Sequence, residues 1–527
     1  MKKIKRRLAL VFAVSLASAA QAAPAPEPDP GIVRFDIVRY DVQGNTLLPA
    51  EQVARVLAPY TGRGRDFGDV QQALEALTAA YQAAGYRLVA VTLPEQELAR
   101  GSVRLQVVQT RIGQVQVHGQ RHVDEANVRR ALPPLREGEV PNLEDISAAL
   151  TLANEHPARQ LTMKLQSGSR EDEVDALLEV ADERQWKAML NADNSGTEQT
   201  GRARVGAVLQ HANLFGRDHL ASLQYTTSAE EPGRVKVYGL GYHIPLYALG
   251  DTLDFYASYS NVDSGAVAVG AFSVAVSGQG AVFGARYSHY LARHPGYEGK
   301  LLFGAESKAF RNSVVLLGQE LGNNVTVRPV SVGYLGSWSA ARGDGGLSLT
   351  LLRNVPGGKR GRQDDFTRAR AGAPDDYTIV RAGASISRLL PGDWQWRAIA
   401  NAQYSPDALV PGEQFGAGGG ASVRGLPERE IANDKGAGLN LELYTPNLCN
   451  ERWQCRLLAF HDRAHVQRND ALPGELTSAS VASSGLGLRV LLGSQANLQL
   501  DYGHVEQGGP TGRDGSGRLH LRLGLAY

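Results

Sequence analysis

The chain ends with the stretch LHLRLGLAY, residues 519–527. Leucine or tyrosine occupies every second position, and the residues between them include His520 and Arg522. Because successive side chains of a β-strand point to opposite faces, one face of this strand is apolar and the other is polar. A soluble sheet rarely packs Arg and His against its core, whereas a membrane barrel has lipid on one face and water on the other. The stretch therefore predicts a strand of a transmembrane β-barrel.

The same pattern extends back to Arg184. Leu220–Tyr225 and Thr252–Tyr259 also alternate, and polar or Gly-rich segments connect the strand-like runs. At roughly 20 residues for each strand with its connection, residues 184–527 form an antiparallel barrel of about sixteen strands. The five tryptophans all fall in this region, as aromatic belts require: Trp186, Trp338, Trp394, Trp396 and Trp453. The fold is predicted to be mainly β. A soluble β-sandwich or β-helix is the alternative, but no short fixed period typical of a β-helix is present.

The first 22 residues have the composition of a secretory signal peptide. A basic segment (residues 2–7) precedes a short apolar segment (residues 8–20), and Ala20-Gln21-Ala22 supplies small residues for cleavage after Ala22. The alternative, a membrane anchor, is disfavoured because the apolar segment is too short to span a bilayer. A short Pro-rich lead follows at residues 23–32. We expect an exported protein.

Residues 33–183 have a mixed α/β pattern that repeats. In the first unit, residues 33–110, a strand-like run ends at Gly44, and a later stretch carries apolar residues at helical spacing: Val70, Leu74, Leu77, Tyr81 and Ala84. The second unit, residues 111–183, opens with a similar strand-like run that ends at Gly119. Two copies of a unit this size predict two small α/β domains before the barrel.

Composition narrows the function classes. The formal net charge is +1, which gives no electrostatic basis for binding nucleic acid. The 12 histidines and the carboxylates show no spacing typical of a catalytic or metal site, so we expect no enzyme activity, no cofactor and no metal. Cys449 and Cys455 are the two cysteines, and in an exported protein their closeness favours a local disulfide. A metal or catalytic pair is the alternative, but no His or Cys cluster accompanies them.

Three stretches resemble the two-partner secretion transporters, the outer-membrane exporters of haemolysin and filamentous haemagglutinin type. The first combines residues 193–196 (DNSG), 200–201 (TG) and 213–218 (NLFGRD). The second is Val423-Arg424-Gly425-Leu426, which resembles the signature of a loop that folds into the barrel, here around residues 416–430. The family usually has an aromatic residue at the position of Leu426. The third is the strand motif Phe460, Asp462 and Ala464, where Ala464 replaces the usual glycine.

The resemblance implies roles for these residues. Arg424 is expected to pair with Asp462 inside the lumen, although both could be merely solvated lumen charges. Tyr527 is expected to end the aromatic-terminated signal that the barrel assembly machinery recognises. The two N-terminal units resemble POTRA domains. Some family members carry an N-terminal plug helix, but only about ten residues separate the predicted cleavage site from the first strand, so we expect no plug here.

The resemblance also implies a function. We expect an outer-membrane transporter whose periplasmic POTRA domains recognise a large secreted partner of β-helical type by its N-terminal secretion domain. The barrel, embedded among outer-membrane lipid and lipopolysaccharide, would export the partner without nucleotide hydrolysis, since folding outside supplies the driving force. One alternative is a barrel-assembly factor, which generally carries more than two POTRA domains. Another is a diffusion porin, which needs no periplasmic domains.

Overall fold

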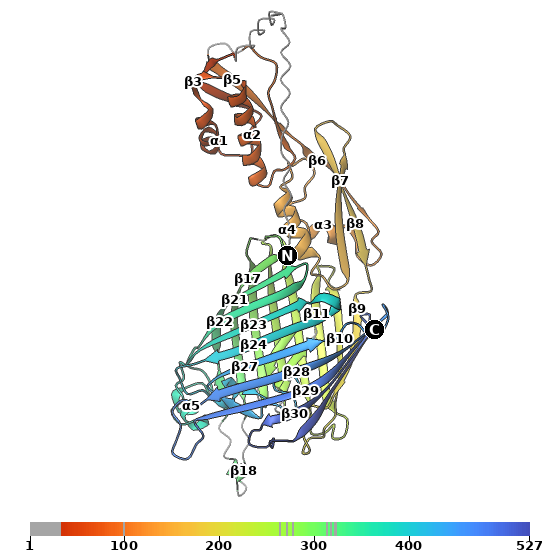
Figure 1. Cartoon of the computed structure of the whole chain (residues 1–527), viewed down its shortest axis with the longest axis vertical. Coiled ribbons are helices and arrows are strands. Elements are labelled where there is room, and N and C mark those ends of the chain that lie inside the picture. Colours follow the sequence, from red (N-terminus) through yellow and green to blue (C-terminus); the bar gives the residue numbers. More distant parts are fainter. Residues whose placement is uncertain are drawn as a thin grey trace, which may run out of the picture. The chain divides into compact units, whose positions relative to one another are not determined.

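The computed structural model (Figure 1) describes residues 33–97, 101–262, 265–269, 272–276, 279–292, 294–311, 315–316, 319–320 and 324–527. The predicted signal peptide and Pro-rich lead lie outside these residues. The chain divides into two compact units between Gln109 and Thr110. None of the helices in the described segments has the length and apolar character needed to cross a membrane.

The first unit is a small α/β domain. Its elements are β1 (Phe35–Ile37), β2 (Arg39–Gln43), α1 (Ala50–Leu57), η1 (Ala58–Tyr60), β3 (Gly62–Arg65), α2 (Phe67–Ala83), β4 (Val89–Thr92) and β5 (Ser102–Gln109). The main sheet has the order β2-β5-β4, with β2 parallel and β4 antiparallel to β5. Asp66 starts α2 by accepting hydrogen bonds from the backbone of Gly68 and Asp69. On the predicted apolar stripe, Val70, Leu77 and Tyr81 are buried.

The second unit begins with another α/β domain, whose sheet has the same topology as that of the first. It contains β6 (Arg111–His118), α3 (Glu125–Arg130), α4 (Leu143–Ala153), β7 (Arg159–Ser167) and β8 (Glu173–Asp182). Its sheet has the order β6-β8-β7, with β6 parallel and β7 antiparallel to β8. Val128 and Leu132 on the helical side pack against Leu161 and Leu178 of the sheet. The predicted pair of small α/β domains is confirmed.

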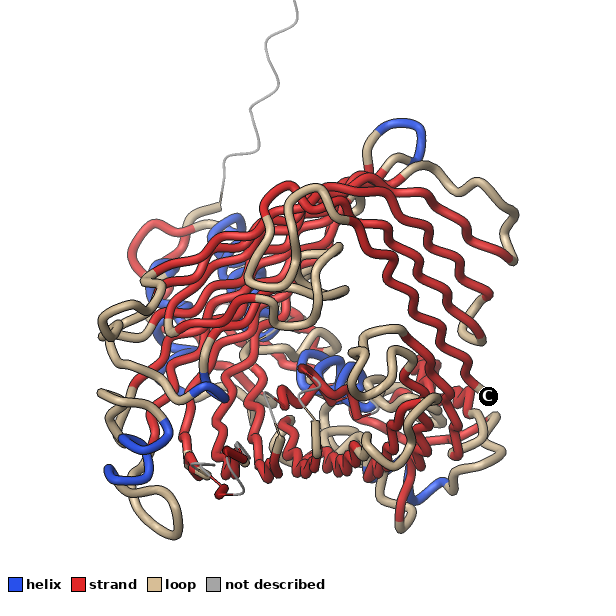
Figure 2. Tube along the Cα trace, turned by 90° about the horizontal axis from the view of Figure 1, so that it is seen from below, coloured by secondary structure: helices blue, strands red, loops and turns tan. Residues whose placement is uncertain are grey.

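The rest of the second unit is a closed antiparallel barrel (Figures 1 and 2). Within the described residues it has sixteen spanning strands, because β20 and β21 follow each other and both pair with β17. The strands are β9 (Trp186–Asp193), β10 (Arg204–Leu214), β11 (His219–Ser228), β12 (Val237–Leu246), β13 (Asp251–Ser260), β16 (Gly280–Tyr290), β17 (Tyr297–Phe310), β20 (Val325–Val327), β21 (Pro329–Ala340), β22 (Gly343–Asn354), β23 (Thr378–Leu389), β24 (Gln395–Tyr404), β27 (Lys435–Tyr444), β28 (Trp453–Gln467), β29 (Ser478–Leu492), β30 (Ala496–Gln507) and β31 (Gly517–Ala526).

The two faces of the barrel wall differ as the sequence predicts. Leu519, Leu521 and Leu525 of β31 are exposed on the outside, whereas His520 between them is 8% exposed and lies on the inner side. The ring closes where β31 pairs with β9, from Arg522 opposite Asp193 to Ala526 opposite Met189. The last strand of the chain is therefore the closing strand of the barrel.

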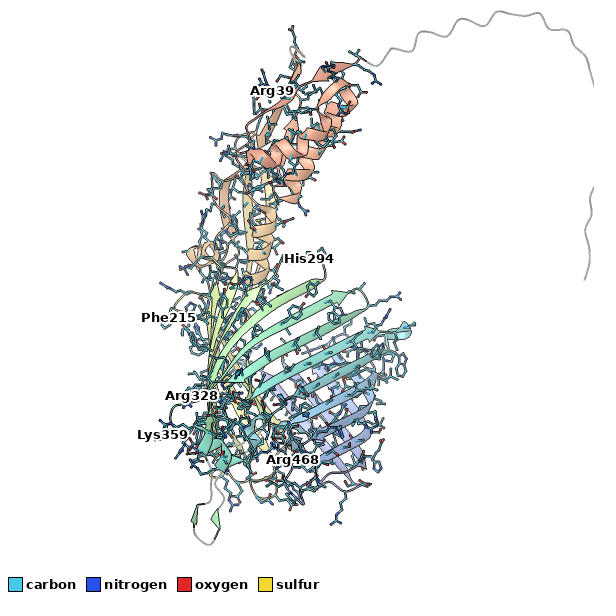
Figure 3. All side chains as sticks on the ribbon, turned by 90° about the vertical axis from the view of Figure 1, so that its left-hand side faces the viewer. Arg39, Phe215, His294, Arg328, Lys359 and Arg468 are labelled. Carbon is cyan, nitrogen blue, oxygen red and sulfur yellow. A yellow bond between two sulfur atoms is a disulfide. The ribbon has the colours of Figure 1, made fainter. Side chains whose placement is uncertain are left out.

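The connections differ between the two ends of the barrel. At the end of the barrel where β9 begins, just after the second α/β domain, the connections are short. Phe215 and His294 label this end in Figure 3. At the other end they are longer and contain β14 (Gly265–Val269), β15 (Phe272–Val276), β18 (Val315–Leu316), β19 (Gln319–Glu320) and α5 (Gln363–Ala369). The connection from β24 to β27 contains the hairpin β25 (Phe415–Ala417) and β26 (Ile431–Asn433) and folds into the barrel, where it packs against inner residues of β28, β29 and β30.

Candidate functional site

The inward connection carries the predicted loop signature at its tip. Val423 and Leu426 are buried in an apolar cluster with Val466, Val481 and Val505, which lie on the inner side of β28, β29 and β30. Leu426 is 0% exposed, so a branched aliphatic side chain fills the place where the family usually has an aromatic ring. The apolar contacts hold the loop tip against the barrel wall and orient the residue between them, Arg424.

Arg424 and Asp462 are in direct contact. The Arg424 Nε donates to Asp462 Oδ2 and Nη2 donates to Oδ1, each at 2.7 Å, which is the two-pronged geometry of a guanidinium–carboxylate pair. The Arg424 backbone N–H also donates to Oδ2 at 3.1 Å. Both side chains are buried, at 4% and 0% exposure. The structure therefore brings together the loop and strand residues that the resemblance pairs.

Further groups from the barrel wall surround the same guanidinium. Nη1 donates to Glu442 Oε1 of β27 at 2.8 Å, and Asp501 Oδ1 of β30 lies 3.7 Å away. The guanidinium carbon lies 3.6 Å from the centroid of the Phe460 ring, a cation–π arrangement. Asn440 donates to Asp462 Oδ1 at 2.7 Å. A single loop arginine thus interacts with three carboxylates and one aromatic face of the wall.

Two glycines allow the loop backbone to reach the wall. Gly425 has a φ of +92°, and a Cβ placed there would lie 2.8 Å from the Gly503 carbonyl oxygen. A Cβ on Gly503 would lie 2.6 Å from the Arg424 carbonyl carbon. The Gly425 N–H donates to Nε2 of His520 on the closing strand at 2.9 Å. The loop tip is consequently bound to β27, β28, β30 and β31.

The base of the loop is held by separate ion pairs. Glu413 pairs with Lys308 of β17 at 3.2 Å and with Arg381 of β23 at 3.0 Å. Asp434 pairs with Arg370, whose Nη2 lies 2.8 Å from Asp434 Oδ2. Both carboxylates are buried, so removing a partner would leave an uncompensated charge. The loop is therefore anchored to the barrel at its base and at its tip.

The sequence did not place Glu442, His520 or the residues at the base of the loop in this site. Asn440 and Glu442 alternate with Leu439, Leu441 and Leu443 on β27, so a count of polar inner positions would have found them. The place of Asp501 beside Arg424 depends on the register of β28, β29 and β30. In the part of the chain that the structure describes, no group of three or more His, Cys, Asp or Glu side chains could hold a metal ion.

Three of the other predicted residues, Cys449, Cys455 and Tyr527, lie at the opposite end of the barrel from the long connections. A disulfide joins Cys449, in the connection between β27 and β28, to Cys455, near the start of β28, with a Cα–Cα distance of 5.3 Å. Tyr527 follows β31 and exchanges backbone hydrogen bonds with Ala188, and this residue is 92% exposed. Ala464 is buried at the apolar cluster under the loop.

A closed sixteen-stranded barrel with a loop bound inside its lumen, preceded by two small α/β domains, is the architecture of an outer-membrane barrel protein with POTRA domains. The chain belongs to the haemolysin secretion/activation protein family ShlB/FhaC/HecB, whose model matches residues 172–490. A ShlB-type POTRA domain model matches residues 35–110. The protein thus resides in the outer membrane with its POTRA domains in the periplasm, and it exports a secreted partner protein through the barrel.

Several known transporters are similar to this chain over most of its length. The outer membrane transporter CdiB of an Escherichia coli strain is 25% identical over 420 residues, which cover 78% of this chain and 68% of CdiB. The heme/hemopexin transporter protein HuxB of Haemophilus influenzae is 20% identical over 399 residues, covering 75% and 69%. The solved structure of CdiB from Escherichia coli has the same fold, with a TM-score of 0.76, 22% identity and coverage of 96% of this chain and 93% of that one.

Proposed function

We propose that this transporter exports one large secreted partner of β-helical type, recognised by the partner's N-terminal secretion domain, and that the inward loop closes the pore at rest. The observation that carries the proposal is the buried Arg424 cluster. An arginine removed from water needs compensating carboxylates, and the loop tip finds them on the barrel wall. The energy of this cluster favours the closed position of the loop. Moving the loop aside requires a ligand that favours the open state, and the partner is that ligand.

The second POTRA domain offers an open strand edge for the partner. The outer edge of β6 is occupied, because Ile112 exchanges backbone hydrogen bonds with Gly138 and Glu139, and the Val115 N–H donates to Glu137. The outer edge of β7 pairs with no other strand in the described part of the chain. We infer that an extended segment of the partner adds to β7 by main-chain hydrogen bonds.

Asn154 limits where the partner strand can begin to pair with β7. Its side chain accepts from the Leu161 N–H at 2.6 Å and donates to the Leu161 carbonyl at 2.9 Å, which fills the ladder position at the start of the edge. Because backbone groups alternate in direction along a strand, the next outward-facing positions are Met163 and Leu165. The partner strand would therefore pair from Met163 onward.

The remaining partners follow from the barrel itself. Exposed leucines on the outside of the wall contact outer-membrane lipid, with lipopolysaccharide in the outer leaflet. The closing strand that ends at Tyr527 is proposed as the segment that the barrel assembly machinery recognises. Export needs no nucleotide, because the partner folds outside the cell and cannot return.

Deletion of the gene tests the proposed function. We expect one large partner protein to remain in the periplasm while other outer-membrane proteins reach normal levels, as measured by quantitative proteomics of periplasm, outer membrane and medium. Re-expression of the full chain should restore export. A general loss of outer-membrane barrels would instead establish an assembly factor, and an unchanged set of secreted proteins would contradict export.

A further inference from the structure

The first short turn of the barrel carries a buried carboxylate that the export pathway described above does not use. Asp218 ends the segment Asn213–Asp218, has a φ of +60° and is 2% exposed. Its Oδ1 accepts from Asn127 Nδ2 at 2.8 Å, and its Oδ2 accepts from the Tyr247 hydroxyl at 2.7 Å and lies 2.9 Å from Arg159 Nη2. Phe215 marks this turn in Figure 3.

The groups that bind Asp218 come from two sides. Tyr247 lies in the next short turn of the barrel, between β12 and β13. Asn127 and Arg159 belong to the second POTRA domain, on α3 and at the first position of β7. Arg159 also donates to Asn127 Oδ1 at 2.5 Å, and its side chain is 0% exposed. The two parts of the chain therefore share one buried polar network.

Two more contacts extend this junction. The His156 Nε2 donates to the Ala212 carbonyl at 2.7 Å, and both residues are buried. Farther along the rim, the Tyr290 hydroxyl donates to Glu155 at 2.5 Å, and Lys300 lies 3.4 Å from the same carboxylate. The second POTRA domain is thus bound to β10, to two turns, and to β16 and β17. Residues 110–527 accordingly form one compact unit.

We infer that Asp218 and Arg159 form a latch that fixes the second POTRA domain on the rim of the barrel and so holds the start of β7 at the mouth of the lumen. This inference rests on the proposed function only in its last step, the delivery of a partner segment from β7 into the pore. Asp218 is a positioning residue, since it acts through its contacts with Asn127 and Arg159 of the domain. The latch needs the negative charge of Asp218, because burying Arg159 without a carboxylate is strongly unfavourable.

The latch can be tested with spin labels on the full chain in lipid. The labels are placed at Gln166→Cys on β7 and Ala341→Cys in a short barrel turn, both exposed positions. The native cysteines are joined to each other and do not react. We expect a single narrow distance distribution in the parent and a broad one in Asp218→Asn. Arg217→Asn, which alters the exposed neighbour, is the matched control and should stay narrow.

Function is measured on the same variants. Asp218→Asn should lose most of its partner export, while the amount of inserted barrel and the single-channel conductance stay at parental levels. A purely structural role in barrel folding would lower those two quantities instead. Where Asp218→Asn yields too little barrel, Tyr247→Phe removes one hydrogen bond to the carboxylate and should broaden the distribution to a lesser extent.

The outcomes separate the latch from the proposed function. A narrow distribution in both Asp218→Asn and Tyr247→Phe overturns the latch. A broad distribution with full export overturns the positioning role. If the parent itself exports no partner, the proposed function fails, whereas the distance measurement still decides whether the latch exists.

Discussion

The Arg424 guanidinium lies inside the barrel with two of its nitrogens 2.7 Å from the two carboxylate oxygens of Asp462. The third guanidinium nitrogen donates a hydrogen bond to Glu442. The charge of Arg424 is therefore balanced by more than one carboxylate, whereas Asp462 has Arg424 as its main partner. The pair joins the inward loop to strand β28 of the barrel wall. We expect this contact to control the position of the loop.

Substitution of either residue should impair export while the barrel still inserts. Breaking a buried pair costs about 3–5 kcal/mol, and less where water enters the lumen. The export defect of Arg424→Ala should be at least as severe as that of Asp462→Ala, because in the Asp462→Ala variant Glu442 still binds the arginine. Arg424→Lys should also be impaired, since an ammonium cannot form the planar fork.

The double variant of Arg424 and Asp462 provides the control for this pair. Its export defect should be close to that of Arg424→Ala, because both changes remove the same interaction. A quantitative secretion assay with matched barrel levels measures all four proteins. Defects that simply add, or a fully active Arg424→Lys, would show that the two residues act separately.

Gly503→Ala should displace the loop tip. A Cβ at this position would lie 2.6 Å from the Arg424 backbone, a separation that real structures do not tolerate. We expect a higher single-channel conductance in planar bilayers than in the parent. Gly233→Ala is the control, because a Cβ there meets nothing within 4 Å. Equal conductance in the two variants would argue that the loop backbone does not close the pore.

Removal of residues 416–430 should open the resting pore. The segment carries Arg424 and Leu426, both buried against the wall, and the last two residues of β25. Bilayer recordings should show a conductance several times that of the parent. A barrel that conducts equally with and without this segment would require another element to close the lumen.

Cys449 and Cys455 should be oxidised in the mature protein. The bond closes a small loop between β27 and β28, for which the chain-entropy model gives about 2 kcal/mol of stabilisation. Mass spectrometry of the outer-membrane protein should find the linked peptide. Cys449→Ser with Cys455→Ser should lower thermal stability modestly and leave export intact. Two free thiols in the mature protein would refute the bond.

His156 should make the junction of the second POTRA domain sensitive to acid. Burial lowers the pKa of His156 below its usual 6.5, the neighbouring Arg159 lowers it further, and Asp218 opposes the change. The folded state therefore holds fewer protons than the unfolded state. The stability that His156 contributes is complete above about pH 6.5 and falls as the pH drops below that value. We therefore expect the junction to loosen in mild acid.

The measurement uses the two spin labels described above at pH 7.5 and pH 5. We expect the distance distribution to broaden at the lower pH in the parent. His156→Gln keeps a donor for the Ala212 carbonyl but cannot titrate, so it should give the same distribution at both pH values. Identical pH responses in the two proteins would exclude His156 as the sensitive group.

The barrel and the two α/β domains could be predicted from the sequence because their signals are local. A strand between lipid and water must alternate at every second residue, as residues 519–527 do. A helix on a sheet must place apolar residues three and four apart, as Val70, Leu74, Leu77 and Tyr81 do. The loop motif at Arg424 and the strand motif at Asp462 were also recognisable, because each is a short run of particular residues.

The further neighbours of this pair were decided only by the tertiary structure. Arg424 meets Glu442 across 18 positions and its neighbour Gly425 meets His520 across 95, because the register of four strands places them on one part of the inner wall. Arg159 and Asp218 meet across 59 positions through the docking of a domain on a turn. Alternation gives the face on which a side chain lies, but strand register and loop folding determine which charges meet there. The sequence therefore carries no sign of Glu442 beside Arg424 or of Asp218 beside Arg159, although the folded protein cannot bury these arginines without carboxylates.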